Sequence, residues 1–275
     1  MKHETSKESI PLTSTPSPLI RHVDPRLMSY NIEMTEVTGG TFWKSYTEEQ
    51  IAGTAAFPSV ASFTDVTAMP ELMEYYPPID LHNKRLRELA KALGPAWIRV
   101  SGTWATKTYY DFEGVTEGKA PEGYSSVLTG EQWMGVLDFA AYVGAKLLIS
   151  VSNCAGDHPH GGPLDLTQAK KIFDFSHQHG KDIDALEFMN EPNMLELSGA
   201  PQGYTAADYA RDQDILYSWV RGQLPQLSPG GPMHHRGPCC RRHTGQRVWG
   251  RDRQHDQDLH HGSIAGRHPS PPGCV

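Results

Sequence analysis

Cysteine is scarce in the body of this chain. Of its four cysteines, three fall in the last 40 residues and only Cys154 lies before them. A single cysteine can form no disulfide within that part of the chain. A thiol near the end of a strand can serve as a nucleophile, but a lone cysteine is more often a small buried packing residue, and we expect the packing role here.

Long apolar runs and an excess of positive charge are also missing. No run approaches the roughly 18 apolar residues of a membrane-spanning helix. The formal net charge of -7 is opposite in sign to the basic charge typical of nucleic-acid-binding proteins. Residues 1–24 lack the apolar core of a signal peptide and read as a disordered lead-in. We therefore expect no membrane or nucleic-acid partner. The location is cytoplasmic by default, or extracellular if the start of the gene is misassigned.

The body of the chain alternates strand-like and helix-like segments. Strands are predicted at 26–33, 97–101, 146–151 and 185–189, and helices at 81–93, 129–144, 167–179 and 205–220. The strands look near-continuously apolar. Four such units predict an α/β protein with a parallel sheet and helical crossovers. Residues 37–80 show no period, and we expect a long loop there with room for one short helix.

Local signals mark the ends of the predicted helices. Asp80 is the expected N-cap of the first helix, in which Leu86, Leu89 and Leu93 recur at helical spacing. Thr205 is the expected N-cap of the last helix.

The second predicted helix begins with a capping box of Thr129 and Gln132 and ends at Gly144. Its inner face is expected to consist of Trp133, Val136, Leu137 and Ala140. In the third helix, Ile172 and Phe173 are expected to point inward. No Gly-rich phosphate loop follows the first strand, which disfavours a nucleotide-binding sheet.

The polarity changes abruptly where the fourth strand ends. The apolar residues 185–189 are followed by Asn190-Glu191-Pro192-Asn193, and Pro192 stops further sheet pairing. The carboxyl end of a buried parallel strand is where α/β-barrel enzymes place their chemistry. Such a tripeptide also arises by chance, and a Glu after a strand can be a solvated loop residue.

Two further strand ends match a known family in the same order. Tyr30-Asn31-Ile32-Glu33 ends the first strand, and the run L-R-E-L-A-K-A-L-G-P-A-W-I-R-V-S-G-T followed by T-K-T surrounds the second. With the Asn-Glu-Pro-Asn run, about residues 25–222 resemble the heparanase and β-glucuronidase group, glycoside hydrolase family 79. The resemblance implies a (β/α)8 TIM barrel, truncated here to about its first four β/α units within residues 25–227.

The family resemblance also implies a site and a substrate. It makes Glu191 the general acid/base of a retaining glycosidase and Asn190 the ligand of the sugar 2-hydroxyl. The other implied sugar contacts are Glu33, Thr103, Trp104 or Tyr109, and Asn153. The implied substrate is a β-glucuronide or a glycan that contains glucuronic acid, and the implied chemistry needs no cofactor or metal.

The partner carboxylate of this chemistry is missing from the predicted strands. In the family the nucleophile is a Glu on the seventh strand, whereas the last Glu here is Glu196, close after Glu191. We therefore expect the chain to be inactive by itself. Two alternatives stay open: a non-catalytic sugar-binding fragment, or an unrelated α/β protein with an incidental Asn-Glu-Pro motif.

Residues 228–275 differ in character from the rest. From residue 229 onward they hold seven Arg but no Lys, Glu, Phe or Tyr, so they lack the apolar surface that would offset the entropy of ordering. We interpret them as a disordered or out-of-frame tail. Neither Cys239-Cys240 with its nearby histidines nor Asp157-His158-Pro159-His160 has the spacing of a metal site, so no metal is expected.

Overall fold

The computed structural model describes residues 22–23, 25–57, 72–195, 197–224 and 227. Nearly all of the predicted lead-in, the tail after residue 227 and the Cys239-Cys240 cluster lie outside these residues.

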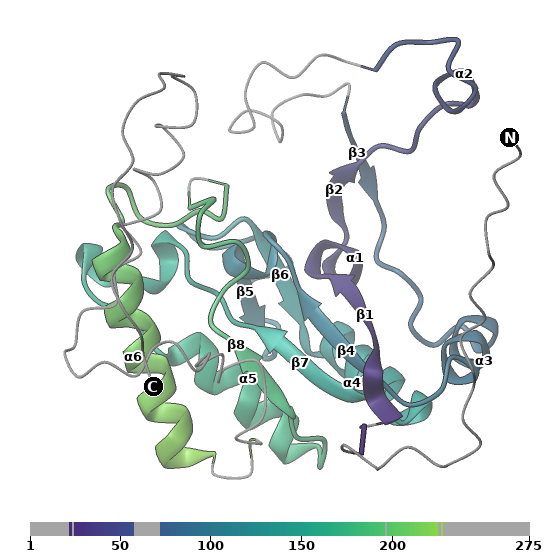
Figure 1. The fold of residues 1–275 in the computed structure, drawn as a ribbon. Helices are drawn as coiled ribbons and strands as arrows, with labels where there is room; N and C mark the ends of the chain where they lie inside the picture. The colour runs from purple at the N-terminus through teal and green to yellow at the C-terminus, as the bar shows by residue number, and fades with distance from the viewer. Residues whose placement is uncertain (1–21, 24, 58–71, 196, 225–226, 228–275) are drawn as a thin grey trace, which may run out of the picture.

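A four-stranded parallel sheet is the centre of the fold (Figure 1). Its strands, in sheet order, are β1 (Met28–Glu33), β4 (Ala96–Ser101), β7 (Lys146–Ser150) and β8 (Ala185–Glu187). Every neighbouring pair of strands is parallel, and the order of the strands across this sheet is the same as their order along the chain. The predicted α/β alternation is therefore confirmed.

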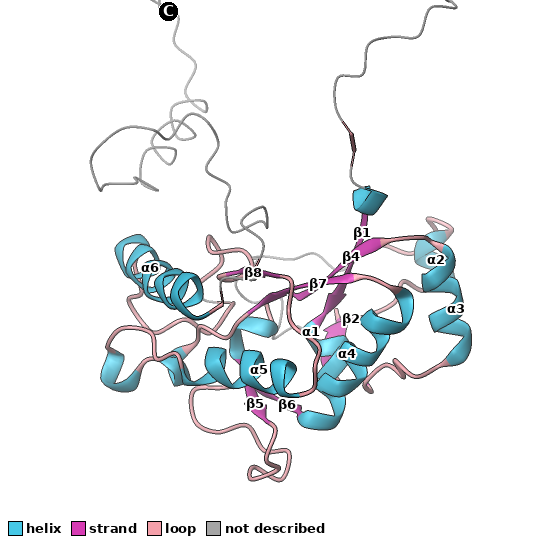
Figure 2. Cartoon of the chain, turned by 90° about the horizontal axis from the view of Figure 1, so that it is seen from below, coloured by secondary structure: helices cyan, strands magenta, loops and turns pink. Residues whose placement is uncertain are grey.

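Four helices accompany this sheet. They are α3 (Lys84–Ala92), α4 (Gly130–Val143), α5 (Thr167–Gln178) and α6 (Ala206–Gln223). Figure 2 shows α4 and α5 on one side of the sheet, with α3 and α6 at its two ends. Side-chain contacts join each helix to the next, among them Arg87 over Tyr142, Trp133 bonded to Ser176, and Phe173 against Trp219. The four helices thus form one layer with two free flanks, α3 and α6.

The two faces of the sheet differ in polarity. The face toward the helices is apolar and buried, and consists of Ile32, Ile98, Val100, Leu147, Ile149 and Leu186. The opposite face, formed by alternate residues, carries Asn31, Arg99, Ser101, Ser150 and Glu187 beside the apolar Leu148 and Ala185. The expectation of near-continuously apolar strands is therefore wrong at these positions. Parallel sheets are normally covered on both faces, whereas these helices cover only one.

The cap of the second predicted helix and the core positions of the second and third are confirmed. The Thr129 hydroxyl accepts a hydrogen bond from the Gln132 N–H at 3.2 Å, and the Gln132 side chain accepts one from the Thr129 N–H at 2.9 Å. Gly144 closes α4 in a left-handed conformation (φ 70°). The predicted inner residues are buried: Trp133, Val136, Leu137 and Ala140 on α4, and Ile172 and Phe173 on α5. Thr205 caps α6 as predicted.

The N-cap predicted for α3 is wrong by three residues. Asn83 caps the helix, because its Oδ1 accepts a hydrogen bond from the Leu86 N–H at 3.0 Å. Asp80 instead accepts a hydrogen bond from the His82 N–H at 2.9 Å and stabilises the preceding turn. Both side chains can cap, and the turn decides which one meets the first free N–H groups.

The leucine stripe of α3 is left largely uncovered. Leu86 is 38% exposed, and Leu89 and Leu93 are each 59% exposed. The helix lies beyond the edge strand β1 (Figure 1), and within the described residues no strand lies outside β1 to cover this face.

Two small sheets were not expected. β2 (Gly40–Trp43) and β3 (Met73–Tyr76) form an antiparallel pair, and β5 (Thr108–Asp111) and β6 (Ser126–Thr129) form a parallel pair. The short helices are α1 (Met34–Thr38), α2 (Glu48–Ile51) and the 3-10 turns Pro25–Leu27, Ala105–Lys107, Ala155–Asp157 and Pro159–Gly161. The prediction of a loop over 37–80 is therefore wrong in part, because four-residue strands are stabilised by distant partners rather than by a local pattern.

Two further expectations concern burial and membranes. Cys154 is fully buried, and burial raises the pKa of its thiol, with the neighbouring Asp157 adding to the shift. This agrees with a packing residue rather than a nucleophile. In the described part of the chain, no helix has both the length and the apolarity needed to cross a membrane.

Candidate active site

Three of the predicted site residues meet at the carboxyl edge of the sheet. Thr103 follows β4, and Asn190 and Glu191 follow β8. The Thr103 hydroxyl donates a hydrogen bond to Glu191 Oε2 at 3.3 Å. The Asn190 amide Nδ2 lies 3.4 Å from Thr103 Oγ1 and 3.2 Å from Glu191 Oε2. Residues nearly 90 positions apart thus form one polar group, because parallel strands end at the same edge.

The backbone of Glu191 is held in an unfavourable conformation. Its φ is 42°, in the left-handed region, and it precedes Pro192, which restricts its backbone further. The Glu191 carbonyl accepts a hydrogen bond from the Met194 N–H at 2.7 Å, which closes the turn. Non-glycine residues in this region cost about 1–3 kcal/mol and cluster at functional sites. Glu117 and His160 also adopt this conformation, so the strain supports Glu191 as a functional candidate only together with its motif and its contacts.

Glu33, at the end of β1, lies directly against Gly102. A Cβ on Gly102 would fall 1.6 Å from Glu33 Oε1, and the φ of Gly102 is 97°. Only glycine fits at this position, both for its conformation and for the close approach of the carboxyl group. Glu33 Oε1 is buried and has no hydrogen-bond partner. A buried oxygen without a partner favours the neutral carboxylic acid.

The electrostatics of Glu33 agree with this geometry. The pKa of Glu33 is raised from its ordinary value of 4.5 to about 7, chiefly by burial and in smaller part by the nearby Glu36 and Glu191 carboxylates. A hydrogen bond from the Trp104 backbone and the charge of Arg99 act in the opposite direction. Near neutral pH the site therefore holds a partly protonated Glu33 within electrostatic range of Glu191.

An ion pair that the sequence analysis missed lies next to this group, on the strands β4 and β8. Arg99 pairs with Glu187 across the polar face of the sheet. Its guanidinium also donates to Asn190 Oδ1 at 2.8 Å and to Asn31 Oδ1 at 2.7 Å. Because arginine only donates, it holds the oxygen of the Asn190 amide toward itself and the Nδ2 toward Glu191. Arg99 thereby sets the orientation of the predicted sugar-binding amide.

Two serines complete the network around this ion pair. Ser101 and Ser150, both fully buried, donate to Glu187 Oε1 at 2.6 and 2.7 Å, and their hydroxyls contact each other. One carboxylate oxygen of Glu187 is therefore fully engaged in hydrogen bonds within the protein. The signal that could have revealed the cluster was present: polar residues stand at alternate positions of 99–101 and at 150 and 187, in strands that are otherwise apolar.

Asn153 is buried behind the strand ends. Its Nδ2 lies 3.4 Å from the Tyr204 hydroxyl and 3.4 Å from Met189 Sδ, and its Oδ1 lies 2.9 Å from His158 Nε2. The Tyr204 hydroxyl in turn donates to Asp212 Oδ2 at 2.8 Å. This network ties the loop after β7 to α6. The predicted sugar contact of Asn153 stays a prediction, with its amide engaged within the protein in this structure.

The two candidate aromatic platforms lie in different surroundings. Trp104, which follows Thr103, packs edge-on against Phe42 with ring centroids 5.1 Å apart. Tyr109 is on β5, where its ring meets Tyr124 at 5.2 Å. Trp104 is therefore adjacent in the chain to the Thr103–Glu191 contact, whereas Tyr109 belongs to the separate β5–β6 sheet.

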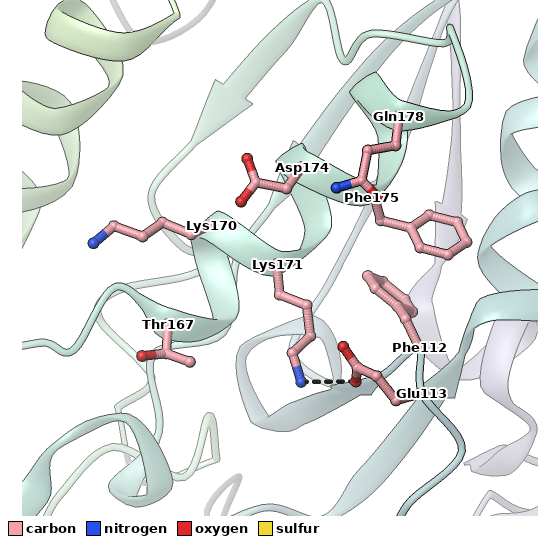
Figure 3. A pocket seen from close by; sticks show the side chains of 8 residues that line it. All are labelled: Phe112, Glu113, Thr167, Lys170, Lys171, Asp174, Phe175 and Gln178. Atoms are coloured by element: carbon pink, nitrogen blue, oxygen red, sulfur yellow. Dashed lines mark hydrogen bonds and ion pairs between the residues drawn. The ribbon is translucent and has the colours of Figure 1, made fainter.

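Across the described ranges, no three His, Cys, Asp or Glu side chains gather in the way a metal ion requires. A shallow cavity of about 380 Å³ lies between α5 and the end of β5 (Figure 3). There Lys171 pairs with Glu113 at 3.2 Å, and Phe112 packs on Phe175 at 4.4 Å. None of the predicted site residues lines this cavity.

Comparison of the chain with protein-family models and with curated protein sequences finds no match.

Proposed function

We propose that this chain is the acid/base-bearing half of a retaining glycoside hydrolase of the family 79 type, with Glu191 as the general acid/base. The observation that carries the proposal is the Thr103–Asn190–Glu191 group at the carboxyl edge of a parallel sheet, with strain at Glu191. The proposed substrate is a β-glucuronide or a glycan that contains glucuronic acid.

The arrangement of the sheet supports a barrel rather than a doubly wound fold. A doubly wound sheet reverses its strand order and carries helices on both faces. Here the order β1-β4-β7-β8 follows the chain without reversal, and α4 and α5 lie on the same face. Four β/α units in this arrangement correspond to half of a (β/α)8 barrel.

The proposed chemistry assigns a role to each group at the edge. The carboxyl group of Glu191 would protonate the leaving oxygen, and Asn190 Nδ2, oriented by Arg99, would donate to the sugar 2-hydroxyl. Thr103 and Glu33 would bind ring hydroxyls. A protonated Glu33 can donate a hydrogen bond as well as accept one.

A non-catalytic sugar-binding role is the second candidate. A retaining mechanism needs a nucleophilic carboxylate about 5–5.5 Å from the acid/base. Oε1 of Glu187 accepts hydrogen bonds from Arg99, Ser101 and Ser150, and Glu33 lies against Gly102 with one oxygen buried. Both carboxyl groups are therefore engaged within the protein, which favours binding of a sugar ring at Glu191 without cleavage.

Hydrolysis and binding should be measured together. Release of the aryl group from an aryl β-glucuronide that is lost in Glu191→Gln, but kept in the exposed control Glu131→Gln, would support catalysis. Calorimetric binding of methyl β-glucuronide that exceeds binding of methyl β-glucoside, without turnover, would support the binding role. A chain that neither binds nor cleaves either sugar would refute both.

A further inference from the structure

The central sheet ends in two unpaired edges. Among the described residues, β1 pairs only with β4, and β8 pairs only with β7. Each edge therefore presents backbone N–H and C=O groups to one side. Natural proteins rarely leave such edges open, because open edges template association.

The helix layer has one apolar and basic flank. The exposed Leu86 and Leu89 of α3 and the exposed Leu93 at its C-cap form a stripe along the helix. The exposed Lys84 and Arg85 lie at the start of the same helix. Together with Arg87 and Lys91 they give α3 four positively charged side chains, whereas Glu88 is its one acidic side chain. Two α3 helices packed against each other would bring like charges together.

The opposite flank of the layer is complementary to this one. On α6, the residues Ala207, Ala210, Asp214 and Ser218 are exposed and recur at helical spacing. Larger side chains of one helix can pack between the rows of small side chains on another. Asp214 and Arg221 are both exposed along this stripe. Over its whole length α6 carries three Asp against two Arg, so its small side chains and the sign of its net charge both suit α3.

We propose that two copies of this chain associate about a twofold axis, with β1 of each copy pairing with β8 of the other. The α3 helix of one copy then packs against the α6 helix of the other, so that both strand edges and both helix flanks are covered at once.

A second copy accounts for these features better than a single added strand. Any one strand from elsewhere would leave one of the two edges open, whereas twofold association leaves none. The resulting eight parallel strands match the number at which side chains just fill the interior of a closed barrel. The polar faces with Arg99 and Glu187 would then face each other across that interior.

This arrangement bears on catalysis only if the proposed function holds. All strands of the closed sheet end at one rim, so the rim would carry Glu33 and Glu191 from both copies. A site with one accessible carboxylate in each chain would thereby acquire a second one from its partner.

Mass measurement tests the association directly. Light scattering after gel filtration of the full chain should give twice the 30.5 kDa chain mass. Leu89→Glu on α3 and Ala210→Glu on α6 should each give the single-chain mass. Ile51→Glu, at a site on α2 that is 73% exposed, should keep the double mass. Unchanged far-ultraviolet circular dichroism would show that the variants still fold.

Mixing the two defective variants tests the twofold geometry. A Leu89→Glu chain paired with an Ala210→Glu chain has one contact with both lesions and one intact contact, so the mixture should partly recover the double mass. A wild-type chain that is monomeric, or that forms polydisperse assemblies, would overturn the proposal, as would insensitivity to Leu89→Glu. Because mass is the readout, absence of glycosidase activity leaves this result unaffected.

Discussion

The partly buried carboxyl group of Glu33 makes folding stability depend on pH in a predictable way. The folded state binds this proton more tightly than the unfolded chain, because the pKa of Glu33 rises from 4.5 to about 7 on folding. The stabilisation is complete below pH 4.5 and is lost as the pH rises through 7. Glu33→Gln keeps the shape and cannot ionise, so it should keep that stability at high pH.

The magnitude follows from the size of the shift. The difference between 7 and 4.5 is about 2.5 units, and each unit corresponds to about 1.4 kcal/mol, which sets a ceiling of about 3.5 kcal/mol that solvent exposure of the group lowers. We expect Glu33→Gln to be more stable than the wild type by about 2–3 kcal/mol at pH 8. At pH 5 the two proteins should differ by less than about 1 kcal/mol.

Urea unfolding of the wild type and of Glu33→Gln at pH 5 and pH 8 measures how the difference in their free energies of unfolding changes with pH. Tryptophan fluorescence can follow the transition, and the protein concentration must be held constant because association alters apparent stability. Glu131→Gln, on the exposed start of α4, controls for the loss of any carboxylate. Parallel pH dependences in the wild type and Glu33→Gln would show that Glu33 does not carry a proton at neutral pH, and the electrostatic description of the site would fail.

Three further predictions concern the backbone. Glu191→Gly should exceed Glu191→Ala in free energy of unfolding by about 1 kcal/mol, because glycine tolerates the φ of 42°; equal stabilities in urea would contradict the strain. Gly102→Ala should lose more than about 2 kcal/mol because its Cβ meets the Glu33 carboxyl group. Gly135→Ala, within α4, should be neutral or stabilising in the same assay, because the nearest atom to its new Cβ is His82 Nε2 at 3.7 Å. Thr129→Ala should lower the melting temperature through a loss of about 1 kcal/mol, since it removes the α4 cap; an unchanged melting temperature would show that Gln132 suffices.

Local patterns were enough to locate most of the regular elements. The capping box at Thr129, the glycine at 144 and the apolar positions of α4 act within a few residues of one another, so they can be read from the sequence. The four main strands were found for the same reason. The β2–β3 and β5–β6 pairs were not, because their short strands depend on partners elsewhere in the chain.

The candidate site was predictable only in its outermost residues. The Asn190-Glu191 run stands out because polarity changes sharply at a strand end. Arg99 and Glu187 could not be predicted as site residues, because a single polar residue in an apolar strand indicates no site until its neighbour on the adjacent strand is known. The register that places β4, β7 and β8 side by side turns these residues into one network.

By itself, the sequence determined the α/β alternation, most of the caps and the position of Glu191 at a strand end. These properties arise from interactions between residues close together along the chain. The tertiary structure alone decided that one face of the sheet is polar, that Glu33 lies against Gly102 and that the leucines of α3 are exposed. Each of those properties depends on which segments become neighbours in space, and periodicity along the chain carries no record of it.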